Sequence, residues 1–416
     1  MLLEFGFGTD VQKVNVKDEN VLDILMSNNV EKALVNEEEV SRALLSPIGT
    51  KRLKDIVKSG DSVAIVTSDI TRPFPTYRVM PALLDELYAG GVKREDITLI
   101  FALGSHRHQT REEQEKIAGK RAAEEITLAD STDFGFTHYG FTKNGTPVDI
   151  CEKVAKADIR ICLGNVEYHY FAGYSGGAKA IMPGVSTREA IQKNHSLMVD
   201  EKAHAGNIKD NPIRRDIEEA AKMVGVDFIL NAVLDEHKNI VFAAAGDVTK
   251  AHRTACEYLD RMYLKPIEKR ADIVIVSQGG APKDLNLYQT QKALDNAKHA
   301  VRKGGTVILV GSCKEGLGEK TFEEWITSAK TPESLITRIK EDFKLGGHKA
   351  AAIAIVLKNA DIYLVSELDE DLVKSIFMKP FKTVEEAYKA AIKKHGENAT
   401  VIAMPYGGST LPREIL

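Results

Sequence analysis

The 416-residue chain has few cysteines and no long apolar run. Its four cysteines, Cys151, Cys162, Cys256 and Cys313, are far apart and form no CxxC pair, which argues against a zinc site and a disulfide framework. No apolar stretch approaches the roughly 20 residues that a membrane helix needs. The first residues, MLLEFGFGTD, lack the basic and apolar segments of a secretory signal. We therefore expect a cytoplasmic protein that does not bind a membrane.

An excess of charge of one sign is also missing. The chain has 56 Lys and Arg against 60 Asp and Glu, a net charge of -4, with both signs mixed along its length. Without a basic block or an acidic tail, nucleic-acid binding is not expected. A hydrophobic content of 43% is enough to bury a sizeable core, and the length predicts two or three domains.

What the chain does have is a repeating pattern of short β-branched runs, polar glycine-containing loops and amphipathic helices. The clearest runs before residue 264 are 62–67, 97–103 and 157–163. A charged, proline-bearing connection, LKPIEKR (264–270), precedes a restart of the same pattern. Continuous apolar strands between helices are typical of a parallel sheet covered on both faces. We predict two α/β domains with mainly parallel, Rossmann-like sheets, at residues 1–265 and 270–416, and an active-site cleft between them.

Polar side chains gather where these predicted strands end, which is where open α/β sheets bind ligands. Such loops are polar in many α/β proteins, so the balance of charge is more informative than polarity itself. The basic residues of these loops, Arg72, Lys179, Lys283 and Lys292, outnumber Asp69 and Glu167. This balance favours an anionic ligand such as a carboxylate or a phosphate.

Lys179 stands alone in YSGGAKAIMPG (174–184), a stretch with no other charge. Its glycines, including Gly176 and Gly177, offer backbone N–H groups that suit a phosphate and leave room beside the lysine. The stretch matches neither a Walker A nor a GxGxxG sequence. A partly buried lysine with few charged neighbours has a lowered pKa and can be modified covalently. The histidines offer proton transfer or transition-metal ligation, but they form no dense metal-ligand pattern.

Taken in order, the motifs SDITRP, GSHRH, EYHYFAGYSGGAK, MPG, NHS, AGD and LYQTQKA make the chain resemble the nickel-dependent lactate racemase family over nearly its whole length. The resemblance implies an isomerase with two α/β domains. It also implies a nickel-pincer nucleotide, a pyridinium-3-thioamide-5-thiocarboxylic acid mononucleotide, attached covalently to Lys179. His195 of NHS would be the protein ligand of nickel, and separate maturation enzymes would supply the cofactor.

The same resemblance implies how D- and L-lactate interconvert. Hydride leaves the substrate for the cofactor and returns to the other face of the keto acid, since no side chain accepts hydride. His106 and His169 would be the two general bases. The remaining polar residues would bind substrate or cofactor: Arg72 and Lys292 the anionic groups, and Asp69, Thr71, Gly176, Gly177, Tyr288 and Gln289 the cofactor pocket.

Three other interpretations stay open. The enzyme could act on another 2-hydroxy acid with the same cofactor, because His348 stands where lactate-acting relatives carry a bulkier aromatic residue. Ala178 stands where many family members have arginine, which would remove one contact to the cofactor or the backbone. It could be a phosphate-binding transferase in which YSGGAK cradles a nucleotide. It could also be a small-anion binding protein with a hinge, which would need neither paired histidines nor an isolated lysine.

Overall fold

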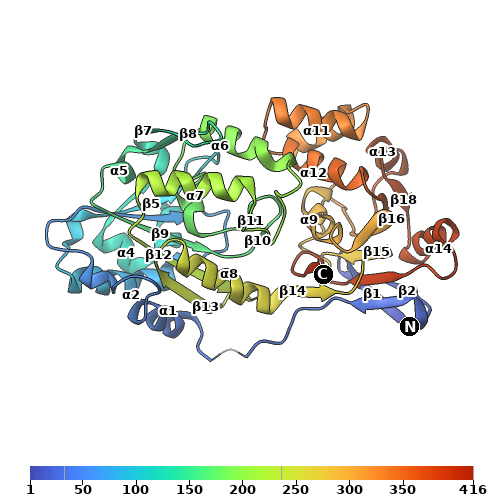
Figure 1. Cartoon of the computed structure of the whole chain (residues 1–416), viewed down its shortest axis with the longest axis horizontal. Helices are drawn as coiled ribbons and strands as arrows, with labels where there is room; N and C mark the ends of the chain where they lie inside the picture. Colours follow the sequence, from blue (N-terminus) through green and yellow to red (C-terminus); the bar gives the residue numbers. More distant parts are fainter. Residues whose placement is uncertain (32, 236, 416) are drawn as a thin grey trace. The chain divides into compact units, whose positions relative to one another are not determined.

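The computed structural model describes residues 1–31, 33–235 and 237–415. The chain forms two compact units (Figure 1). We call Val30–Arg261 the central unit, and Met1–Asn29 together with Met262–Leu416 the terminal unit. Each unit contains one six-stranded sheet whose neighbouring strands are mainly parallel, which confirms the predicted fold class. None of the helices in the described part of the chain is long and apolar enough to cross a membrane.

The sheet of the central unit has the strand order β13-β12-β9-β4-β5-β6. All neighbours in it are parallel except β12 and β13. Its strands are β4 (Val63–Ser68), β5 (Ile97–Ala102), β6 (Thr127–Asp130), β9 (Ile159–Asn165), β12 (Phe228–Leu234) and β13 (Ile240–Gly246). The apolar runs predicted at 62–67, 97–103 and 157–163 are thus β4, β5 and β9. Because these strands are parallel neighbours, the loops that follow them leave the sheet at the same edge.

Besides its sheet, the described part of the central unit contains eight α-helices and two short hairpins. The helices are α1 (Asn36–Leu45), α2 (Thr76–Ala89), α3 (Arg111–Ala118), α4 (Lys120–Glu125), α5 (Glu152–Ala155), α6 (Arg188–His195), α7 (Pro212–Val224) and α8 (Lys250–Tyr263). The hairpins are β7 (Phe136–Phe141) with β8 (Pro147–Cys151), and β10 (Tyr168–His169) with β11 (Gly173–Tyr174).

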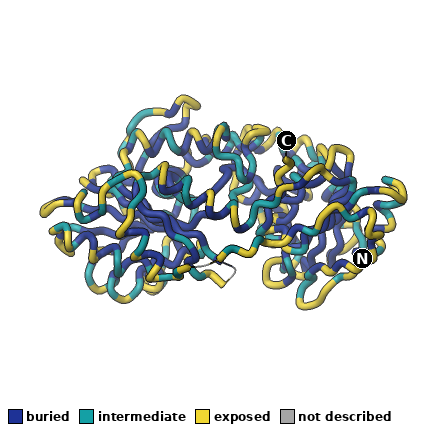
Figure 2. Tube along the Cα trace, turned by 60° about the horizontal axis from the view of Figure 1, so that its bottom comes forward, coloured by how far each residue is buried: buried dark blue, intermediate teal, exposed yellow. Residues whose placement is uncertain are grey.

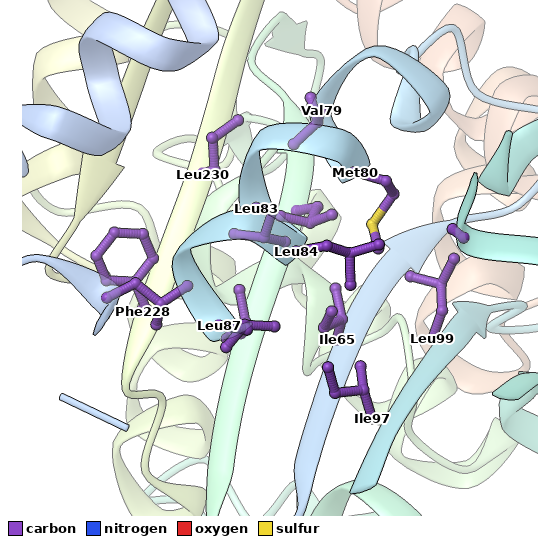
Figure 3. Packing of buried hydrophobic residues seen from close by; sticks show 14 of the residues in the cluster. Ile65, Val79, Met80, Leu83, Leu84, Leu87, Ile97, Leu99, Phe228 and Leu230 are labelled. Carbon is purple, nitrogen blue, oxygen red and sulfur yellow. The ribbon is translucent and has the colours of Figure 1, made fainter. Parts of the chain in front are cut away.

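The packing of α2 shows how the central core is built (Figure 3). Its apolar residues recur at helical spacing, so Met80, Leu83 and Leu87 share one face. That face lies against strand residues such as Ile65 of β4 and Leu230 of β12, all of them fully buried. Burying one such side chain contributes roughly 1.5–3 kcal/mol. The core therefore fixes the strands whose ends carry the polar loops.

The sheet of the terminal unit has the order β18-β17-β16-β15-β19-β3 and is parallel throughout. Its strands are β3 (Val21–Ile24), β15 (Ala271–Ser277), β16 (Val301–Val310), β17 (Asp361–Val365), β18 (Lys379–Phe381) and β19 (Val401–Met404). The hairpin of β1 (Leu2–Phe7) and β2 (Asp10–Asn15) packs with α14 (Val384–His395) in one buried core. The other helices are α9 (Leu287–Ala297), α10 (Lys320–Ser328), α11 (Pro332–Glu341), α12 (Gly347–Leu357) and α13 (Glu370–Ser375). Figure 2 shows the interiors of both units as buried and many of their turns as exposed.

The division of the chain differs from the expected one at two places. The first 29 residues belong to the terminal unit, because β3 pairs with β19 and Phe5 is fully buried in the core of that unit. The connection predicted at 264–270 begins just after the unit boundary between Arg261 and Met262 and belongs to the terminal unit. Its first four residues form β14 (Leu264–Ile267), which pairs in parallel with β20 (Leu411–Glu414). Both differences arise from strand pairing between segments that lie far apart in the sequence.

Candidate active site

The loops that follow β4, β5 and β9 form the candidate site of the central unit. The loop after β5 is tied to the end of the loop after β9, since the N–H of Gly104 donates to the carbonyl of Gly184 over 3.0 Å. The loop after β4 carries Asp69, and that after β5 carries His106. A tight turn shapes the first of these loops, because the Arg72 N–H donates to the Asp69 carbonyl over 3.2 Å.

Asp69 and His106 form a close polar pair in this region. The Nδ1 atom of His106 lies 2.6 Å from Oδ2 of Asp69, and the Thr71 hydroxyl donates to Oδ1 over 2.6 Å. Asp69 is only 4% exposed, whereas the His106 side chain is 32% exposed. Burial alone would raise the pKa of Asp69, but hydrogen bonds from His106 and Thr71 outweigh it and the pKa is lowered. The carboxylate therefore stays ionised and holds a proton on Nδ1 of His106.

The other members of the GSHRH motif point elsewhere. His108 is exposed and lies beside Asp130 and Asp133 at 3.5 and 3.4 Å. Arg107 forms two hydrogen bonds with Glu113, of 2.7 and 2.8 Å. The structure thus separates the two histidines of the motif, since only His106 joins the loop that carries Asp69.

The ring of Phe171 is the common neighbour of three predicted site residues. The amine of Lys179 lies 5.9 Å from the ring centroid. The ring of His169 packs edge-on at 4.4 Å, and that of His195 packs edge-on at 4.9 Å. Phe171 itself is 3% exposed. Sequence reasoning missed this residue, although the aromatic run EYHYF directly before the lysine loop was a signal.

Lys179 and His169 both lie in a setting that disfavours positive charge. Burial lowers the pKa of Lys179 well below its ordinary value, and the charges of Arg214 and Arg72 lower it further, while Glu167 opposes them. Burial likewise lowers the pKa of His169, helped by the charges of Lys179 and Arg72. The charge of Arg72 thus contributes to the lowered pKa of both the lysine and the histidine. The neutral amine is the nucleophilic form, and these effects favour that form of Lys179.

His195, at the end of α6, is oriented by a buried polar network. Its Nδ1 lies 3.0 Å from Oδ1 of Asn194, whose Nδ2 donates to Asp216 over 2.8 Å. Asp216 is fully buried and also accepts from Thr146 over 2.7 Å. Because the amide nitrogen faces a carboxylate, the amide oxygen faces His195, and the proton of the ring is held on Nδ1. The lone pair of a neutral His195 is then on Nε2, as a metal ligand requires.

The loop before Lys179 uses its backbone N–H groups within the protein. The N–H of Ser175 donates to the Glu167 carbonyl over 2.9 Å, and that of Gly177 donates to Oδ1 of Asn231 over 2.8 Å. The N–H of Lys179 donates to the Gly176 carbonyl over 3.3 Å. These three groups therefore do not form the exposed cradle that the glycines suggested.

Packing explains both glycines of the pair. Each has a positive φ, 75° at Gly176 and 59° at Gly177. A Cβ at Gly176 would lie 2.9 Å from Asn231, and one at Gly177 would lie 2.8 Å from the ring of His252. Close approach to neighbouring side chains, together with backbone conformation, thus accounts for these residue types.

The other predicted residues, Tyr288, Gln289 and Lys292, lie on the first turns of α9 in the terminal unit. Here the structure reveals Lys349, a 5% exposed residue that sequence reasoning missed. Its amine donates to the Tyr288 carbonyl over 2.8 Å and lies 4.4 Å from the centroid of that ring. Burial lowers the pKa of Lys349 to about 7, with a further contribution from the charge of Lys292. A lone lysine in the run GGHKAAA was the available signal.

His348 is 6% exposed and accepts a hydrogen bond of 2.9 Å from the Gly346 N–H, so it is buried within the terminal unit. Among the described residues, no group of three or more His, Cys, Asp or Glu side chains could hold a metal ion. A metal near His195 would accordingly need ligands that come with a cofactor.

Comparison with known proteins matches two family models. Residues 7–206 match the lactate racemase N-terminal domain, and residues 267–411 match the lactate racemase C-terminal domain. The chain is 33% identical to the lactate racemase of Thermoanaerobacterium thermosaccharolyticum over 99% of each chain. It is 32% identical to the lactate racemase of Lactiplantibacillus plantarum, over 94% of this chain and 95% of that protein.

Solved structures agree with these matches. The fold is similar to that of the lactate racemase apoprotein from Thermoanaerobacterium thermosaccharolyticum, with a TM-score of 0.89 and 32% sequence identity over 99% of this chain and 100% of that one. A protein from Thermotoga maritima has a TM-score of 0.63 at 19% identity, over 93% of this chain and all of its own, and shows a likeness of fold alone.

Proposed function

Because this chain belongs to the lactate racemase family, we propose that it interconverts D- and L-lactate with a nickel-pincer nucleotide attached to Lys179. One observation carries the proposal: Lys179, His169 and His195 surround the ring of Phe171. The tethering amine, one base and the protein ligand of nickel are thus neighbours. Phosphate binding alone, or anion binding without turnover, would not require these three groups together.

The residues fit such a cofactor. The lowered pKa of Lys179, caused first by burial, favours the uncharged amine that forms a thioamide bond. Nε2 of His195, with Nδ1 held by Asn194, would supply one ligand to nickel. When bound, the cofactor supplies the hydride acceptor that side chains lack. The maturation enzymes that make this cofactor would be partners of the chain, and we place the protein in the cytoplasm with them.

His106 is the better-prepared base. Asp69 holds the proton of Nδ1, so Nε2 of His106 can take the hydroxyl proton of a 2-hydroxy acid. His169 would serve the opposite enantiomer. Its Nδ1 accepts a hydrogen bond of 3.3 Å from the Ala172 N–H, which places the proton of the neutral ring on Nε2. In this tautomer Nε2 of His169 donates a hydrogen bond, so the ring would act as a base at Nε2 after a change of tautomer.

Cations would hold the substrate carboxylate and the cofactor phosphate. Arg72 is exposed, and its charge acts on both Lys179 and His169. Lys292, on α9, influences the buried Lys349. Guanidinium and ammonium groups are the usual partners of carboxylates and phosphates. We assign Arg72 and Lys292 to these anions, Asp69 to the orientation of a nearby cation, and Asp69, Thr71, Gly176, Gly177, Tyr288 and Gln289 to the cofactor pocket.

The proposal is tested with protein produced together with the maturation enzymes and nickel. Purified enzyme is incubated with pure L-lactate and with pure D-lactate, and both enantiomers are followed by chiral chromatography. We expect each to approach an equal mixture, and protein made without nickel to be inactive. Racemisation of a larger 2-hydroxy acid but not of lactate would favour the alternative substrate. Loss of one enantiomer to another product would contradict racemisation altogether.

A further inference from the structure

Arg214 is a fully buried arginine behind the lysine loop. Its guanidinium donates hydrogen bonds to main-chain carbonyls of that loop: those of Tyr174, of Ala172 at 3.3 Å and of Gly176 at 3.4 Å. Within the described part of the chain, no carboxylate forms an ion pair with it. The nearby Glu218 is instead engaged by Arg253 through hydrogen bonds of 2.8 and 2.9 Å.

The first turn of α7 fixes the position of this arginine. Asn211 caps the helix by accepting from the N–H groups of Ile213 and Arg214 over 3.0 and 3.1 Å. The same side chain donates to the Phe171 carbonyl over 2.8 Å. From α8, His252 donates to the Ser175 carbonyl over 2.8 Å. Side chains of the two helices thus hold carbonyls at five positions between residues 171 and 176.

A buried guanidinium is costly unless its charge and its donors are used. Burial lowers the pKa of Arg214 to about 10, which leaves it charged at neutral pH. After burial, its charge is the next cause of the lowered pKa of Lys179. The charged groups that act with it on this amine are Arg72 and Glu167, and the amine in turn acts on the titratable ring of His169. Arg214 therefore acts on Lys179 both through the loop and through its field.

We propose that Arg214 is a positioning residue for Lys179: it holds the carbonyls of Ala172, Tyr174 and Gly176, and its buried positive charge favours the neutral, nucleophilic form of the Lys179 amine. This inference rests on the proposed role of Lys179 as the tether, but the reactivity of the amine can be measured before any cofactor is attached. The two ideas can therefore fail separately.

The test uses full-length protein made without the maturation enzymes. Wild type, Arg214→Met, Arg214→Lys and the control Arg215→Met are acetylated with trace acetic anhydride between pH 6 and pH 10, and modification of Lys179 is quantified by peptide mass spectrometry. Arg215 is the adjacent, exposed residue of α7, so it controls for loss of an arginine from this helix. Exposed Lys303 serves as the internal reference.

We expect Lys179 of wild type and of Arg215→Met to react at lower pH than Lys303. In Arg214→Met its reactivity at pH 7 should fall about tenfold, because less of the amine is neutral without the nearby charge. Arg214→Lys keeps the charge and should restore part of this reactivity, a rescue that a purely structural role does not predict. If Arg214→Met does not fold, as judged by circular dichroism, the pH dependence of Lys179 labelling in Arg214→Lys is compared directly with that of wild type.

Unchanged pH dependence of Lys179 in every folded Arg214 variant would overturn the inference. So would equal losses in Arg214→Met and Arg215→Met. A second measurement, the fraction of chain that gains cofactor mass after coproduction with the maturation enzymes, should fall in Arg214→Met and match wild type in Arg215→Met. If wild-type chain gains no such mass while the labelling result holds, the tether fails and the positioning role stands.

Discussion

Nδ1 of His106 lies 2.6 Å from Oδ2 of Asp69, and the carboxylate is almost completely buried. Its other oxygen accepts from the hydroxyl of Thr71. An ionised, desolvated carboxylate holds the imidazole in one tautomer and stabilises the imidazolium that forms when the ring takes a proton. This pair distinguishes His106 from His108, which belongs to the same sequence motif but lies at the surface.

Asp69→Asn should therefore impair proton transfer without unfolding the protein. An amide in place of the carboxylate no longer selects the Nδ1-protonated ring, so racemisation should slow on the order of 10²–10⁴-fold. Lactate turnover by the loaded enzyme measures this loss, with thermal unfolding as the check on folding. His108→Gln is the matched control and should keep wild-type activity. Similar losses in both variants would contradict the assignment.

The two histidine bases can be distinguished with single enantiomers. His106→Ala and His169→Ala should each lose racemisation, but each should still transfer hydride from one lactate enantiomer in single-turnover mixing. Loss of a general base typically costs ~10²–10⁴-fold, so the lost half reaction should be clearly slower than the retained one. Cofactor absorbance after mixing follows each half. A variant that reacts weakly and equally with both enantiomers would remove that histidine from the base role.

His195→Ala should lower the nickel content of the protein. The imidazole presents Nε2 as a ligand because Asn194, fixed by Asp216, holds Nδ1. Elemental analysis of protein made with the maturation enzymes gives nickel per chain. His138→Ala, which removes an exposed histidine paired with Asp149, should keep the wild-type value. Retained nickel together with a lower melting temperature in His195→Ala would mark His195 as structural.

Lys349 should make the terminal unit more sensitive to pH. Its pKa is about 7 in the folded chain, against an ordinary value of 10.5, mainly because of burial. Between these values the unfolded chain binds a proton that the folded chain does not, so stability rises with pH. The free energy of unfolding of wild type, relative to Lys349→Met, should increase from about pH 7 to about pH 10. Lys358→Met, at an exposed position after the same helix, should show no such trend.

Much of the fold can be predicted from the sequence. The runs at 62–67, 97–103 and 157–163 are strands because continuous β-branched and apolar residues suit a sheet buried on both faces. The N-terminal 29 residues could not be placed in this way. Their strand β3 (Val21–Ile24) pairs with β19 (Val401–Met404), which lies near the other end of the chain. Pairing between such distant segments leaves no local pattern in the sequence.

Part of the candidate site can likewise be predicted from the sequence and part cannot. Lys179, His106 and His195 stand out in short motifs, whereas the groups that orient them come from distant segments. Arg214 is one of two adjacent arginines in α7, and only the structure shows which of them is buried. Its position three residues before Ile217, on the apolar face of the helix, was the available signal. Asp216 gave none, because its partners lie in the β7–β8 hairpin and at the end of α6.

The intact mass of the denatured chain tests the central claim most directly. Wild type and Lys179→Arg are each produced with the maturation enzymes and nickel and measured under denaturing conditions. The arginine keeps the positive charge but cannot form the thioamide. We predict that wild type carries the additional mass of the nucleotide and that Lys179→Arg is folded, unmodified and inactive. An active wild type without added mass, or the same added mass on Lys179→Arg, would contradict the tether on which this account depends.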